Sequence, residues 1–109
     1  MTELLLVMTS LPNEDVAKVL AKRLINAHLA ACVQIQSGVQ SIYCWEGRLC
    51  EEQEAVLVAK TTAEQWPAIS AFIKQNHPYD VPEIIAQPIT HSHADYARWV
   101  IAETTVAPN

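Results

Sequence analysis

Residues 41–61 read SIYCWEGRLCEEQEAVLVAKT, and this stretch decides the fold. Two runs suited to β-strands flank Glu46 and Gly47, and glycine accepts the positive φ angle that a tight turn requires. The stretch therefore predicts a β-hairpin that turns at Glu46-Gly47. Its second arm ends in the apolar run AVLVAKT, residues 55–61.

The two arms of this hairpin are longer than a small domain needs. They cover roughly residues 31–45 and 48–61, and they would reach on the order of 45 Å at about 3.3 Å per residue. Strands are usually about five or six residues long. Unpaired backbone groups at a sheet edge tend to pair with another strand, so we expect the excess length to pair with a second subunit.

The residues before the hairpin predict a strand, a helix and a further strand. ELLLVMT, residues 3–9, is an apolar run of strand length. A helix is expected over about residues 13–28, because apolar residues recur there at helical spacing and Asn13 suits the N-cap. AACVQIQS, residues 30–37, alternates as a strand does, and Gly38 marks a bulge or bend.

A second helix is expected directly after the hairpin. Thr61 with Glu64, or Thr62 with Gln65, matches a capping box. The apolar face of this helix would consist of Trp66, Ile69, Phe72 and Ile73. Pro67 is tolerated only near the first turn, so the helix is expected to begin later than the capping pattern suggests.

Three prolines punctuate residues 76–90, NHPYDVPEIIAQPIT. Pro78 stops the second helix just after His77, because proline also disfavours helical geometry in the residue before it. PEIIAQPI, residues 82–89, predicts a fourth strand in which Pro82 stands at the start and Pro88 suits an edge. All three prolines therefore have a structural explanation.

A last helix is expected from the capping pair Ser92 and Asp95. Its inward-facing residues would be Tyr96, Trp99 and Val100. TTVAPN, residues 104–109, is expected to form a tail.

The predicted order is strand, helix, two strands, helix, strand and a final helix. This α+β order, βαββαβ plus a C-terminal helix, matches a ferredoxin-like antiparallel sheet with helices on one face, in a single domain over residues 1–109. Three strands, however, are apolar on both faces, in the runs LLLVM, AVLVA and EIIA. One helix layer covers only one face, which again predicts an obligate oligomer.

The composition excludes several classes of function. The net charge is −5 and the pI is about 5.2, with scattered Lys and Arg, so we expect neither nucleic-acid binding nor membrane-surface binding. No uncharged run approaches a membrane span, and the first twelve residues lack the basic region of a secretory signal. Cys32, Cys44 and Cys50 cannot all pair within one chain, which favours reduced thiols and a cytoplasmic protein.

Five segments together resemble one known family. In order and spacing, AACVQI, SIYCWEGRL, KTT, HPYDVPEII and PITHSHADYARWV resemble the CutA family, which is named for divalent-cation tolerance. The resemblance covers nearly the whole chain. It implies a ferredoxin-like subunit and a homotrimer whose sheets pair edge to edge, similar to the trimers of PII signalling proteins. It also implies binding of copper or another divalent metal ion.

The same resemblance directs attention to Met8 and His77 as metal ligands. Copper-binding members of the family look to use a cysteine late in the first strand and two histidines before Pro-Tyr, where this chain has Met8, Asn76 and His77. Thioether and imidazole groups suit copper better than magnesium or calcium. His77 has an alternative structural interpretation, because a histidine at a helix end can bond the last carbonyl groups.

His91 and His93 are a second candidate metal pair. On an extended segment they would share a face and could chelate a metal ion, although beside Ser92 they also suit the flanks of a helix cap. Cys32 reads as a small core residue. Cys44 and Cys50 flank the hairpin turn and could approach each other, but no closed four-ligand zinc pattern is present.

No catalytic residues are assigned, and we expect a protein that is not an enzyme. The sequence has only Gly38 and Gly47 as glycines and thus no glycine-rich phosphate loop. Fold class alone assigns no function.

A ligand cleft between subunits is the alternative to a metal site. Polar-tipped and aromatic residues stand near the ends of the predicted strands, where small-molecule sites are common. They are equally compatible with an interfacial core whose polar tips are hydrogen-bonded. The candidate cleft residues are Tyr43, Trp45, Glu46, Lys60, Tyr79 and Glu83. The function predicted first is therefore a trimeric metal-tolerance protein, and the second is a PII-like signalling or scaffold trimer that binds a small molecule.

Overall fold

A computed structural model describes residues 2–105. The elements follow the order β1 (Leu4–Leu11), α1 (Glu14–Asn26), β2 (Cys32–Trp45), β3 (Arg48–Thr62), the 3-10 turn η1 (Ala63–Gln65), α2 (Trp66–Gln75), β4 (Ile85–Ile89) and α3 (Ala94–Thr105). The predicted order of strands and helices is confirmed.

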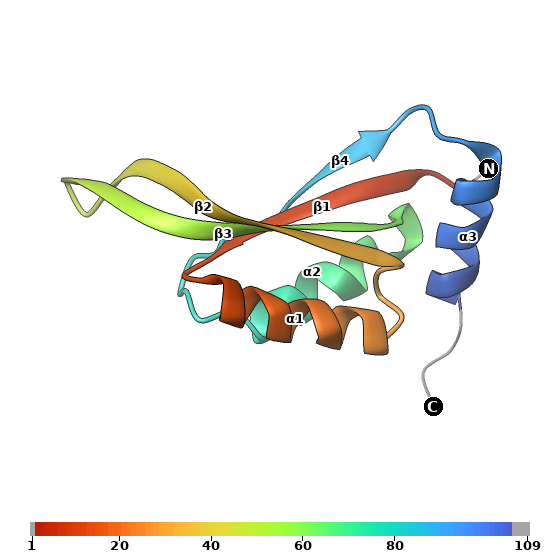
Figure 1. Cartoon of the computed structure of the whole chain (residues 1–109), viewed down its shortest axis with the longest axis horizontal. Coiled ribbons are helices and arrows are strands. Elements are labelled where there is room, and N and C mark those ends of the chain that lie inside the picture. The colour runs from red at the N-terminus through yellow and green to blue at the C-terminus, as the bar shows by residue number, and fades with distance from the viewer. Residues whose placement is uncertain (1, 106–109) are drawn as a thin grey trace.

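The four strands form one sheet in the order β2-β3-β1-β4, and all neighbours are antiparallel. Figure 1 shows α1 and α2 on the same side of this sheet, whereas α3 stands at the end where β1 begins. The β2–β3 hairpin extends beyond the helix layer along the longest dimension of the chain, which is 45 Å. The sheet therefore has one face covered by helices and a long, free hairpin.

The tight turn of the hairpin lies where the sequence predicts it. Glu46 and Gly47 have φ angles of 52° and 77°, which is the left-handed region in which glycine is favoured. The predicted irregularity at Gly38 is also present, because the β2–β3 register shifts between Gln36 and Val39 and Gly38 has a φ of 70°.

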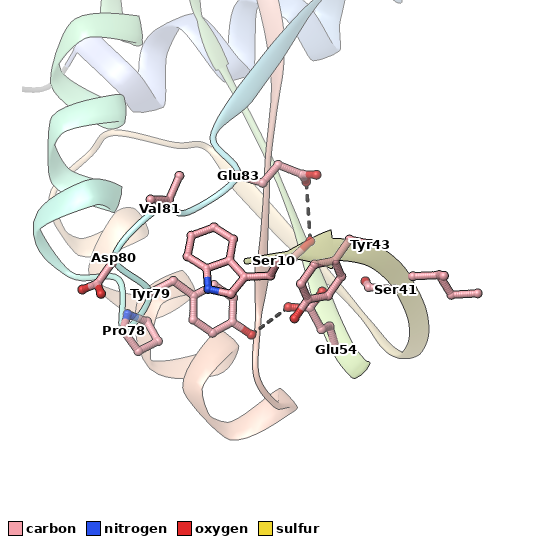
Figure 2. Close-up of a pocket in the computed structure, with 11 residues that line it drawn as sticks. Ser10, Ser41, Tyr43, Glu54, Pro78, Tyr79, Asp80, Val81 and Glu83 are labelled. Atoms are coloured by element: carbon pink, nitrogen blue, oxygen red, sulfur yellow. Dashed lines mark hydrogen bonds between the residues drawn. The ribbon is translucent and has the colours of Figure 1, made fainter. Parts of the chain in front are cut away.

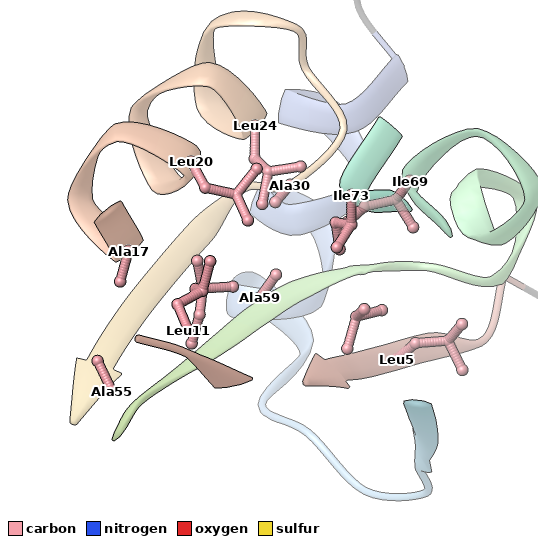
Figure 3. Packing of buried hydrophobic residues seen from close by; sticks show 12 residues of the cluster. Leu5, Leu11, Ala17, Leu20, Leu24, Ala30, Ala55, Ala59, Ile69 and Ile73 are labelled. Carbon is pink, nitrogen blue, oxygen red and sulfur yellow. The ribbon is translucent and has the colours of Figure 1, made fainter. Parts of the chain in front are cut away.

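The main core lies between the sheet and the two helices. β1 and β3 each bury alternate residues, and α1 and α2 contribute the facing side chains (Figure 3). Leu11, Leu24, Leu57, Ile69 and Ile73 are fully buried. Burial of an aliphatic side chain of this size stabilises the fold by roughly 1.5–3 kcal/mol.

The other face of the sheet, which we call the helix-free face, is also apolar. It carries Leu6 and Met8 of β1, Val56 and Val58 of β3, and Ile85 of β4, which pair with one another or lie two residues apart in the register. The first four are half-buried and Ile85 is 50% exposed in the single chain. This agrees with the prediction that one helix layer covers only one face of the sheet.

Several predicted helix details differ from the structure. The N-cap Asn13 accepts a hydrogen bond from the Val16 amide at 2.9 Å, as expected. Thr62, in contrast, makes no side-chain capping bond, and the 3-10 turn η1 precedes α2, so the predicted capping box is wrong. Helix α2 begins only at Trp66, with the proline in its first turn, as the sequence predicted.

The C-terminal part holds the largest differences. Strand β4 begins at Ile85 rather than at residue 82, because the segment before it forms a loop. Helix α3 continues to Thr105, and Thr104 is buried and bonds the Val100 carbonyl, so the predicted tail starts too early. The rest of that predicted tail, residues 106–109, lies outside the described residues.

Two of the three inward-facing residues predicted for the last helix are exposed. Val100 is fully buried, but Tyr96 and Trp99 are 38% and 43% exposed. The two rings contact each other, with centroids 5.6 Å apart, on the surface of the single chain. Periodicity identified an apolar stripe on α3, but within one chain the sheet covers only part of it.

Candidate ligand cleft

A hollow of the described chain lies at the end of the helix-free face where the hairpin leaves the sheet. Its volume is about 680 Å³. Three parts of the chain line it: the outer half of β2, the loop between α2 and β4, and the neighbouring residues of β1 and β3 (Figure 2). The lining consists of Ser10, Ser41, Ile42, Tyr43, Trp45, Glu54, Pro78, Tyr79, Asp80, Val81 and Glu83.

The strand register explains why these residues meet. Ser41, Tyr43 and Trp45 are two apart on β2 and therefore share a face of the ribbon. Glu54 of β3 pairs with Val39, two residues before Ser41. On the other side of the hollow, the loop 78–83 carries Tyr79 and Glu83 back to the sheet just before β4 begins.

Two side-chain contacts join the loop to the strands. The Tyr79 hydroxyl donates a 2.7 Å hydrogen bond to Glu54 Oε2, and the Ser10 hydroxyl makes a longer contact of 3.5 Å with Glu83 Oε2. Both appear as dashed lines in Figure 2. Burial first, and then the bond to Glu54, raises the pKa of Tyr79, so its hydroxyl stays protonated and donates.

Tyr43 stands in the same electrostatic environment. Its pKa is also raised, first by desolvation and then by the nearby Cys50, Glu52 and Glu54. Acidic neighbours therefore influence both tyrosines of the cleft.

Hydrogen bonds of His77 connect loop 78–83 to the end of β1. Its Nδ1 accepts a 3.1 Å hydrogen bond from the Tyr79 amide, so Nε2 carries the proton and donates to the Ser10 carbonyl at 2.9 Å. Nε2 also lies 3.1 Å from Thr9 Oγ1. Burial is the main cause that lowers the pKa of His77, which favours the neutral ring that this arrangement needs.

The structure brings four of the six predicted cleft residues together. Tyr43, Trp45, Tyr79 and Glu83 line the hollow, but Glu46 and Lys60 do not. Glu46 occupies the hairpin turn. Lys60 lies on the helix-free face and donates to Gln34 Oε1 at 2.5 Å.

Sequence reasoning missed Glu54, Asp80 and the two serines of the lining. Glu54 is one of four acidic or amide residues in the run EEQE, and nothing in that run singles it out. After the register shift at Gly38, Glu54 pairs with Val39 and so lies on the same face as Ser41 and Tyr43. This pairing is the feature that places Glu54 in the cleft.

The structure separates the candidate metal ligands into three places. Met8 projects from the helix-free face, whereas His77 bonds Thr9, whose side chain is buried on the opposite face of β1. His91 and His93 lie on the exposed segment between β4 and α3. Among residues 2–105, no group of three or more His, Cys, Asp or Glu side chains is placed to hold a metal ion.

The cysteines also lie apart from one another. Cys32 is half-buried and pairs with Lys60 outside the main core cluster, so the core assignment is wrong. Cys44 pairs with Leu49 and Cys50 with Tyr43, which places the two thiols on opposite faces of the ribbon. The expectation that Cys44 and Cys50 approach each other is therefore wrong within one chain.

His28 and His93 have structural contacts of their own. The His28 ring donates through Nδ1 to the Glu103 carbonyl at 3.2 Å, which ties α3 to the second residue after α1. His93 Nδ1 accepts from the Asp95 amide at 3.2 Å, at the start of α3. This is the capping role that the sequence left open for His93.

Within residues 2–105, no helix is both long enough and apolar enough to cross a membrane.

Comparison with known proteins gives a consistent family. The family model described as CutA1 divalent ion tolerance protein matches residues 5–103. The divalent-cation tolerance protein CutA of Thermus thermophilus is 43% identical over 98 residues, covering 90% of this chain and 95% of its own length. Protein CutA 1, chloroplastic, of Oryza sativa is 40% identical over 96 residues, which cover 88% of this chain and 54% of that relative.

Solved structures agree with this result. The crystal structure of the divalent ion tolerance protein CutA1 from Ehrlichia chaffeensis has a TM-score of 0.92 at 29% identity and covers 97% of this chain and 99% of its own. The Thermus thermophilus structure has a TM-score of 0.89 at 42% identity, with 95% and 99% covered. The chain belongs to the CutA1 divalent ion tolerance family, and its fold is the α+β, ferredoxin-like, PII-like fold of that family.

Proposed function

We propose that this CutA1-family chain acts without catalysis as a homotrimeric divalent-cation tolerance protein that binds copper. The main support for a homotrimer is the exposure of the helix-free face. There Leu6, Met8, Val56 and Val58 are only half-buried and Ile85 is 50% exposed. An apolar sheet face of this kind is normally covered by a second layer. A second copy of the chain is the partner that the family architecture supports.

The edges of the sheet support the same proposal. Strands β2 and β4 are the two edge strands, and the outer part of β2 extends beyond the helices. Free backbone donors and acceptors on such edges are available for pairing with another copy. Leu49 at the hairpin tip is 78% exposed, which is costly for a side chain with no partner surface.

The pair His91 and His93 is the first candidate for the copper ligands. Their Nδ1 atoms contact Thr90 Oγ1 and the Asp95 amide, and no bond to either Nε2 is present among the described contacts. Two exposed imidazoles separated by one residue suit copper. His77 comes second and would bind without Met8, which projects from the opposite face of β1 within one chain; a metal ion at His77 must replace its bonds to Ser10 or Tyr79.

The copper proposal is tested by titrating the reduced, metal-free protein with Cu(I), Cu(II) and Zn(II) in a calorimeter. We expect saturable copper binding that His91→Gln/His93→Gln abolishes and that His77→Gln retains. Loss of copper binding in His77→Gln alone would move the site to that residue. Absence of copper binding by the wild-type protein would contradict the metal part of the proposal.

A second candidate function rests on the cleft itself. A hollow of about 680 Å³ that combines aromatic rings with carboxylates and hydroxyls has the size of a small-molecule site. We infer that a PII-like signalling or scaffold trimer would bind its ligand there, and that a second subunit borders the site. A thermal-shift screen of metabolites tests this candidate, since a metal-independent shift that Tyr79→Ala removes would support it.

Cytoplasmic location stays a prediction from the cysteine content. Fractionation of the source cells, followed by immunodetection of the protein, would test it. Recovery in a non-cytoplasmic fraction would contradict it.

A further inference from the structure

Three aromatic rings border the cleft from two sides. Tyr43 and Trp45 come from the hairpin and Tyr79 from the loop, and Figure 2 shows the two tyrosines beside the same hollow. In the single chain, Tyr43 and Trp45 are 42% and 48% exposed. The faces of such rings carry partial negative charge and attract cations.

The charged groups that line the cleft all have one sign. Glu54, Asp80 and Glu83 contribute carboxylates, and Ser10 and Ser41 contribute hydroxyls. Tyr79 holds Glu54 through its 2.7 Å hydrogen bond, and Ser10 contacts Glu83 at 3.5 Å; the remaining oxygens of both carboxylates can accept further bonds.

No Lys or Arg is among the residues that line the cleft in the described chain. Lys74 donates its ammonium group to the Asp80 carbonyl at 2.8 Å. Arg48 pairs with Trp45 in the hairpin register, but it is not among the lining residues. Within the described chain, the cleft therefore combines aromatic surface with carboxylates as the only charged groups of its lining.

This combination distinguishes between classes of cation. A hard metal ion such as Mg²⁺ or Ca²⁺ takes six or more oxygen ligands, and aromatic walls supply none. An organic ammonium group makes diffuse contacts with rings and carboxylates, and its carbon substituents bury apolar surface against the same rings.

We propose that the cleft is a binding site for small organic cations that carry a quaternary or alkylated ammonium group. This inference rests on the ligand-binding candidate of the proposed function and adds the chemical class of the ligand. Trp45 and Tyr43 contact the ammonium group, and Glu54 and Glu83 supply the opposite charge.

The test compares two probes of the same shape and different charge. Choline and its neutral carbon analogue 3,3-dimethylbutan-1-ol are titrated into the full-length protein by calorimetry. We expect choline to bind about tenfold more tightly than the neutral analogue, a difference of about 1.4 kcal/mol, because only choline makes cation–π and carboxylate contacts. Acetate serves as the anionic probe, and we expect no binding of it.

Substitutions then locate the bound probe. Trp45→Leu should weaken choline binding about fivefold or more, and Trp45→Phe should restore most of the affinity because it restores an aromatic face. Glu54→Gln should weaken choline binding to a similar extent while its amide oxygen still accepts from Tyr79. Glu103→Gln, an exposed carboxylate on α3 outside the cleft, is the matched control and should bind choline as the wild type does.

Three results would overturn the inference. These are equal affinity for the two isosteric probes, choline binding that Trp45→Leu leaves unchanged, and binding of acetate in place of choline. The metabolite screen distinguishes failure of the organic-cation proposal from failure of the ligand-binding candidate function. An anionic or neutral ligand whose shift Tyr79→Ala removes would preserve the ligand cleft and refute the cation class, whereas no ligand of any class would refute both.

Discussion

The inner and outer halves of the same hairpin differ sharply in burial. The inner half of β3, residues 55–62, pairs with β1 on one side and β2 on the other, and alternate residues there are completely buried. The outer half, residues 39–54, pairs only with itself, and its side chains are exposed or half-buried. Both halves are β-strands, so strand geometry alone does not explain the difference in burial. Side chains are buried only where β1 and the helices pack against the hairpin.

The largest expected effect comes from truncating a matched pair of leucines. Leu57→Ala in the inner half should lower the free energy of unfolding by about 2–5 kcal/mol, because it leaves a cavity in the core. Leu49→Ala, at a residue 78% exposed in the single chain, should leave subunit folding within about 0.5 kcal/mol. Urea unfolding monitored by circular dichroism measures both variants.

The same pair also probes assembly. Under the proposed oligomer, Leu49→Ala should shift the dependence of unfolding on protein concentration, because it alters a subunit contact. Equal losses of stability for Leu57→Ala and Leu49→Ala at every protein concentration would contradict the contrast between the two halves.

The second-largest effect is expected at loop 78–83, which borders the cleft opposite the outer half of the hairpin. Tyr79→Phe removes the hydroxyl that donates to Glu54 and should cost about 1 kcal/mol, the usual net value of one hydrogen bond. Tyr43→Phe is the matched control, because no hydrogen bond from its hydroxyl is present among the described contacts, and it should be nearly neutral. A double-mutant cycle with Glu54→Gln should show coupling for Tyr79→Phe and none for Tyr43→Phe.

The smallest effect is the pH dependence contributed by His77. Its pKa is lowered in the folded protein, chiefly by burial, with Lys74 acting in the same direction and the Ser10 carbonyl and Glu54 opposing. The unfolded chain therefore binds a proton first, so this contribution to stability is complete above about pH 6.5 and is lost as the pH falls below it. Urea unfolding between pH 7.5 and pH 5 should show a shallower decline for His77→Gln than for the wild type.

His91→Gln provides the control for that experiment. His91 is exposed and outside the cleft, so this variant should retain the wild-type slope. A steeper decline in His77→Gln, or the same flattening in His91→Gln, would contradict the role of His77 in holding loop 78–83.

The sequence predicted best what local backbone chemistry determines. Gly47 and Gly38 identified the turn and the bulge, because both positions need a positive φ angle. Apolar runs of strand length identified β1 and the inner half of β3, and Asn13 identified the start of α1. These features follow from a few neighbouring residues and need no knowledge of tertiary partners.

What the sequence could not predict depends on contacts between distant residues. Tyr79 and Glu54 are 25 positions apart, and only the register shift and the path of loop 78–83 bring them together. Tyr96 and Trp99 have the correct helical spacing for a core, yet they are 38% and 43% exposed in the single chain. Periodicity identifies an apolar face and leaves its partner undetermined.

Light scattering on the purified protein at low micromolar concentration tests the central claim most directly. The claim is that the outer hairpin and the helix-free face are completed by other copies of the chain. The predicted mass is three times the 12.1 kDa of one chain, with apparent stability that rises with protein concentration. A well-folded monomer of 12.1 kDa at that concentration would contradict the claim.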